Sequence, residues 1–196
     1  MNTKNLTGLM LIISPIVAMS VYVVWSIIAP NQSPGELRAN SDILTPLLLI
    51  VGLALLMWSI GLKWLADTMT DGNGGDYARM GGLLIIIATT GILVEISYMI
   101  GTAGAPAEVS DMLYIQGQTV GVIATIVQFL GLSILGIGIY MQKNLNKYIP
   151  CLMVLAGVIG IVFALMDYSS PLMGIAYIGF AISSVLLGIF YRKAKD

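Results

Sequence analysis

Six long apolar segments alternate with short polar ones along this 196-residue chain. A helix needs about 20 predominantly apolar residues to cross the hydrocarbon core of a bilayer. The pattern therefore predicts an all-α integral membrane protein, with one six-helix bundle made of residues 1–196 and joined by short loops. The predicted spans are approximately 6–29, 43–65, 80–100, 112–141, 149–165 and 172–191. The fourth span would be about 45 Å long at 1.5 Å per residue, so we expect it to tilt, kink or project from the bilayer.

The composition supports a membrane protein and excludes a soluble domain. Hydrophobic residues make up 58% of the chain and charged residues only 10%, whereas about a quarter of the residues in soluble domains are charged. Too few polar groups are present to cover a water-exposed surface. The net charge of −1 gives no reason to expect nucleic-acid binding.

The distribution of lysine and arginine predicts the orientation. Cytoplasmic loops carry an excess of these residues. Only Arg38 lies in the first, third and fifth loops, whereas eight cations lie near the two termini and in the second and fourth loops. These eight are Lys4, Lys63, Arg79, Lys143, Lys147, Arg192, Lys193 and Lys195. We expect both termini to be cytoplasmic. The layout resembles that of small six-span prokaryotic proteins, which implies the cytoplasmic membrane of a prokaryote.

The outward-facing side is predicted to be acidic and bordered by aromatic residues. Asp42, Asp111 and Asp167 stand near the starts of the three helices that enter from outside. They could form an acidic rim shared by three related hairpins, but helix capping is the simpler explanation. Five aromatic residues fall near the outer boundary and are interpreted as an interfacial belt. These are Tyr22, Trp25, Tyr98, Tyr114 and Tyr168.

Small residues recur at helical spacing along the fourth span. This seam comprises Gly117, Gly121, Ala124, Gln128 and Gly131. Small side chains let two helix backbones approach closely in a membrane, and the Gln128 amide must find a partner there. Packing within the bundle is the simpler explanation. A homodimer or a membrane-protein partner is the alternative, with the lipid bilayer as the expected surroundings.

Glu95 is the one ionisable residue well inside a predicted span, about 8 Å below the outer boundary. An intramembrane carboxylate indicates function by default. It must be protonated, or remain charged and face water or a bound cation. Four polar side chains reach a comparable depth and are its candidate partners in an intramembrane site, namely Gln116, Thr119, Tyr22 and Tyr177. The structural alternative is a neutral glutamate that ties the third and fourth spans together.

The residues that the chain lacks exclude several classes of catalytic and metal site. There is no histidine and only one cysteine, Cys151, so histidine-based catalysis and cysteine clusters for zinc or iron–sulfur are excluded. No nucleotide loop or hydrolase motif is present. We expect no metal, no cofactor and no enzymatic activity.

Two functions remain open at this stage. The first is a non-catalytic accessory or interaction subunit of a larger membrane complex. The alternative is a small transporter or channel-like carrier that uses Glu95 as its proton- or cation-linked group. A cavity that reaches Glu95 would favour the carrier, and a solid bundle would favour the accessory subunit.

Overall fold

A computed structural model describes residues 3–69, 72–143 and 146–193, so Lys195 of the orientation count lies outside the described residues. Within these ranges the chain is all-α, as predicted. The helices are α1 (Thr3–Ile28), α2 (Pro34–Ala39), α3 (Ser41–Asp67), α4 (Gly75–Gly104), α5 (Ala107–Gln142), α6 (Tyr148–Asp167) and α7 (Leu172–Lys193). All except α2 are long and apolar enough to cross a membrane.

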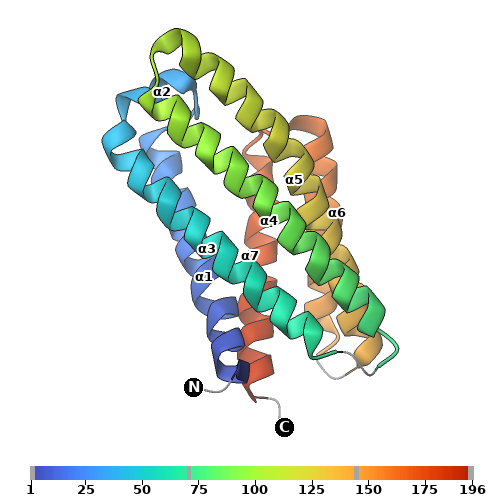
Figure 1. The fold of residues 1–196 in the computed structure, drawn as a ribbon. Helices are drawn as coiled ribbons and strands as arrows, with labels where there is room; N and C mark the ends of the chain where they lie inside the picture. Colours follow the sequence, from blue (N-terminus) through green and yellow to red (C-terminus); the bar gives the residue numbers. More distant parts are fainter. Residues whose placement is uncertain (1–2, 70–71, 144–145, 194–196) are drawn as a thin grey trace.

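The six long helices form a closed ring (Figure 1). Each packs against the next in chain order, from α1 and α3 through α4, α5 and α6 to α7, and α7 returns to pack against α1. Both termini lie at one end of the ring, here called the terminal end. The opposite end, here called the α2 end, carries α2 and the α4–α5 turn, and α6 and α7 join on this side.

Several helices are longer than the sequence pattern indicated. With 36 residues, α5 is about 54 Å long, and Figure 1 shows it running obliquely to α1. The short helix α2 was not predicted. Its start is fixed by the Ser33 hydroxyl, which accepts a hydrogen bond from the Glu36 N–H at 3.3 Å, and by Pro34 in the first turn.

The outside of the ring is apolar. Large aliphatic side chains on it are more than half exposed, including Ile13, Leu53, Ile123 and Leu165. A helix satisfies its own backbone hydrogen bonds, so such a surface is stable in lipid but not in water. These features establish a multi-pass membrane protein.

The small-residue seam of α5 packs against α4. All five predicted seam residues are buried. A Cβ atom added at Gly131 would lie 2.9 Å from the Gly81 carbonyl oxygen, closer than real Cβ contacts allow. Because α4 covers this seam, it cannot also serve as a dimer interface. The expectation of packing within the bundle is therefore correct for this surface.

An aromatic layer fills the middle of the ring. The rings of Trp58 and Phe180 are 4.2 Å apart between centroids, and those of Phe129 and Phe180 are 6.1 Å apart. The Trp58 indole N–H also donates to the Ser184 hydroxyl at 2.8 Å, which joins α3 to α7 across the interior. Below this layer, toward the terminal end, fully buried Leu62 and Leu187 continue the core.

Candidate functional site

A pocket of about 300 Å³ occupies the α2 half of the ring, above the aromatic layer. Its walls come from α1, α3, α4, α5 and α7, and Trp58 of the aromatic layer also lines it. The segments 30–32 and 168–171, which follow α1 and α6, line it as well. A volume of this size is at the small end of the range for small-molecule sites.

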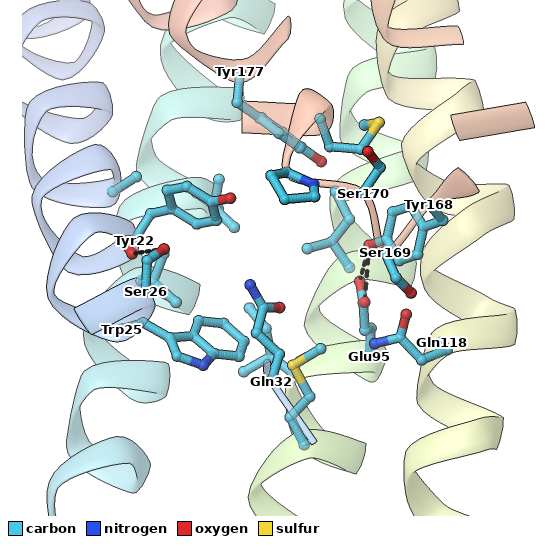
Figure 2. A pocket seen from close by; sticks show the side chains of 18 of the residues that line it. Tyr22, Trp25, Ser26, Gln32, Glu95, Gln118, Tyr168, Ser169, Ser170 and Tyr177 are labelled. Carbon is cyan, nitrogen blue, oxygen red and sulfur yellow. Dashed lines mark hydrogen bonds between the residues drawn. The ribbon is translucent and has the colours of Figure 1, made fainter. Parts of the chain in front are cut away.

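Glu95 of α4 forms the polar anchor of the pocket. Glu95 is only 5% exposed. The Tyr168 hydroxyl donates to the two Glu95 carboxylate oxygens at 2.8 and 3.0 Å (Figure 2). Gly121 of the seam makes room for this carboxyl group, because a Cβ atom added there would overlap it. The seam therefore does more than pack two helices: it also leaves space for a buried acid.

No lysine or arginine lines the pocket among the described residues. Arg38, the one cation predicted near this end, lies elsewhere. Its guanidinium is 3.8 Å from an Asp111 carboxylate oxygen and 3.5 Å from the Ala107 carbonyl oxygen. The charge of an ionised Glu95 is therefore not balanced by any described cationic side chain of the pocket wall.

Longer polar contacts continue from Tyr168 toward the bundle centre. The Thr125 hydroxyl lies 3.5 Å from the Tyr168 hydroxyl and 3.2 Å from that of Tyr177. The Tyr177 hydroxyl in turn lies 3.3 Å from the Gln128 amide oxygen. This contact gives Gln128 the partner that its depth required, although most of these distances exceed those of strong O–H···O bonds.

The opposite wall is aromatic and comes from α1. Figure 2 shows Tyr22 and Trp25 on one side of the open space and Glu95 with Tyr168 on the other. The Trp25 indole nitrogen is buried and has no hydrogen-bond acceptor among the described residues. A buried donor without a partner costs free energy, and this nitrogen has almost no surface accessible to water in the structure.

The structure brings together some of the predicted site residues and separates others. Glu95, Tyr22 and Tyr177 line the same pocket. Gln116 and Thr119 are exposed on the outside of the ring, and the Thr119 hydroxyl bonds to the Ile115 carbonyl of its own helix at 2.9 Å. Their predicted place beside Glu95 is wrong.

The physical reason is the rotation of α5 about its axis. Depth can be counted from the sequence, but residues at one depth point in different directions, since successive residues are about 100° apart. Gly117 and Gly121 face α4, and the pocket takes Tyr114 and Gln118 from the adjacent stripe of the helix.

Sequence reasoning missed Tyr168 as the partner of Glu95, and it missed Trp25, Tyr114 and Gln118 as pocket residues. The three aromatic residues were assigned to an interfacial belt, whereas the structure places them in the pocket wall. Their depth matched that of Glu95. The spacing of Tyr114, Gln118 and Thr125 was the available signal, because it places these polar side chains on one helical stripe beside the seam.

The acidic residues of the α2 end do not form a common site. Asp42, Asp111 and Asp167 are all exposed. The Asp167 carboxylate accepts from the Ser169 N–H at 3.0 Å, and Asp111 lies in the second turn of α5 because that helix begins at Ala107. Local turn and surface roles account for these groups.

The described residues contain no cluster of three or more histidine, cysteine, aspartate or glutamate side chains that could hold a metal ion. No protein-family model, curated protein or solved structure matches this chain.

Proposed function

We propose that this protein is a small-molecule carrier and that the pocket is its binding site, with Glu95 as the proton- or cation-linked group. The observation that carries the proposal is the pocket itself. A space of about 300 Å³ reaches a buried carboxylate in the half of the bundle near the α2 end. A carboxyl group whose only role was to join two helices would not need such a space.

The electrostatics of Glu95 support a carrier. A buried carboxylate must be neutralised, because isolated charge is costly in a low-dielectric interior. Tyr168 contributes hydrogen bonds but no charge. A proton or a bound cation must supply the neutralisation, and exchange between the two would couple ligand movement to proton movement.

We place the pocket on the outward-facing side of the cytoplasmic membrane and both termini in the cytoplasm. The support is the Lys/Arg asymmetry, because seven of the eight lysine and arginine residues that the structure describes belong to segments near the terminal end. We also propose a non-catalytic role, since the chain has no histidine to act as a general base and no described serine of the pocket wall hydrogen-bonds to Glu95.

The pocket favours a carrier over an accessory subunit. The seam that suggested a partner is covered by α4, and small residues of α6 and α7 also pack within the chain. Ala156 packs on Gly179, Gly160 on Phe129, and Gly188 on Gly8. A solid interior and an uncovered seam would have favoured the accessory role.

Thiol labelling tests whether the pocket is open to the outside. In a Cys151→Ala background, Ser26→Cys places a thiol in the pocket wall of α1. Thr119→Cys is the matched control, because it lies at similar depth but on the exposed, lipid-facing side of α5. Methanethiosulfonate reagents react with thiols in water, so a membrane-impermeant reagent should distinguish the two.

We expect an impermeant methanethiosulfonate added to intact cells to modify the Ser26→Cys variant much faster than the Thr119→Cys variant. Equal, slow labelling of both would mean that water does not reach the pocket from outside. That result would contradict the proposed function and the orientation assigned to it.

A further inference from the structure

We infer that the ligand of this pocket is an organic monocation, an amine or quaternary ammonium with a compact apolar body. This inference rests on the proposed function and names the chemical class that the site accepts.

The charge of the pocket wall indicates that the ligand is a cation. Glu95 is the only charged side chain among the described residues that line it. An anionic ligand would meet this carboxylate with no cationic side chain to offset it, and a neutral ligand would leave its neutralisation to a proton. A cation is the one class of ligand that satisfies the carboxylate on binding.

The aromatic side chains of the pocket wall indicate that this cation is organic. Tyr22, Trp25, Tyr114 and Tyr177 line the pocket together with Tyr168. The faces of such rings attract organic cations, and aromatic residues are the usual recognition elements for quaternary ammonium groups. Figure 2 shows Tyr22 and Trp25 across the open space from Glu95, so a cation between them could contact the carboxylate and the rings together.

The remaining lining distinguishes an organic cation from a metal ion. Leu55, Ile92 and Met99 contribute apolar surface. Sodium, potassium and divalent ions need several oxygen ligands around them, whereas an alkylammonium ion needs one counter-charge and apolar contacts.

Proton competition gives the pH dependence of binding. The titratable groups that line the pocket with Glu95 are all tyrosines: Tyr22 on α1, Tyr114 on α5, Tyr168 after α6 and Tyr177 on α7, while α3 contributes none. Among these side chains the carboxyl group is the one whose reference pKa lies below neutral pH. A cation binds its ionised form, so lowering the pH weakens binding.

Choline and 3,3-dimethylbutan-1-ol test the inference, because they share one shape and differ in charge. Binding of each is measured by isothermal titration calorimetry on the full chain in detergent. We expect choline to bind about tenfold more tightly than the alcohol. Glu95→Gln should remove that preference and its pH dependence, whereas Asp111→Asn, at an exposed carboxylate outside the pocket, should leave both unchanged.

A second variant keeps the test informative if Glu95→Gln does not fold. Trp25→Leu removes one aromatic face and should weaken choline more than the alcohol. Equal affinities for choline and the alcohol would overturn the inference. The inference would also be overturned if choline did not bind although the Ser26→Cys thiol was labelled from outside. In that case the carrier proposal would stand. Absence of both binding and labelling would overturn the carrier proposal as well.

Discussion

Replacement of Gly121 by alanine tests how the seam and the buried acid depend on each other. A Cβ atom at this position would overlap the Glu95 carboxyl group, so the carboxyl must move away from Tyr168. Hydrogen bonds to charged groups contribute about 1.5–3 kcal/mol and overpacking costs about 1–3 kcal/mol. Alanine has a higher helix propensity than glycine, which recovers up to about 1 kcal/mol. The two costs do not add in full, because movement of the carboxyl group breaks the hydrogen bond but relieves the overpacking. We therefore expect a net loss of about 2–3 kcal/mol in the free energy of unfolding.

Thermal unfolding in detergent, followed by circular dichroism, measures this loss. For a chain of this size it corresponds to a fall in Tm of roughly 5–10 °C. Gly104→Ala is the matched control, because nothing lies within 4 Å of a Cβ added there. Its Tm should stay the same or rise slightly.

A double-mutant cycle tests whether the loss of stability in Gly121→Ala acts through Glu95. In a Glu95→Ala background the carboxyl group is absent, so Gly121→Ala should cost little. A similar Tm loss in both backgrounds would show that the added methyl group acts on something other than Glu95. An unchanged Tm in the wild-type background would refute the close approach of α4 and α5.

Two further predictions concern the site and the closure of the ring. Tyr168→Phe removes the short hydrogen bond to Glu95 and should lower the free energy of unfolding by about 1–3 kcal/mol; a Tm equal to that of the wild type would show that this bond contributes nothing. Gly188→Ala brings a Cβ atom to 2.8 Å from the Gly8 carbonyl oxygen and should separate α1 from α7, with a Tm loss corresponding to about 1–3 kcal/mol. Gly174→Ala is the control on the same helix, because the atom nearest to an added Cβ is the Tyr22 hydroxyl oxygen of α1 at 3.4 Å, an ordinary contact. It should be tolerated, and equal losses at the two positions would contradict the closed ring.

The helices and the seam were accessible from the sequence because each depends on local composition. Apolar length predicts a span, and small residues at Gly117, Gly121 and Gly131 predict close helix packing. Both predictions needed no knowledge of which helices are neighbours. The short helix α2 was missed because a polar connector of this length carries no hydrophobic period.

The candidate site was only partly accessible. Glu95 was found from its cost in a membrane, and Tyr22 and Tyr177 were found from their depth. Tyr168 lies 73 residues from Glu95 and follows the end of α6, so only the closure of the ring brings it near. Gln116 and Thr119 were chosen over Gln118 because one sequence fixes the depth of a helical residue but not its direction.

Proton-coupled uptake of choline into proteoliposomes tests the central claim most directly. With a lumen more acidic than the medium, a carrier that exchanges a proton for a cation at Glu95 should accumulate radiolabelled choline. Collapse of the pH gradient should abolish this accumulation. Glu95→Gln should abolish it in a protein that reconstitutes normally, and Asp111→Asn should retain it. Uptake that is absent in the wild type, or that continues unchanged in the Glu95→Gln variant, would contradict the account.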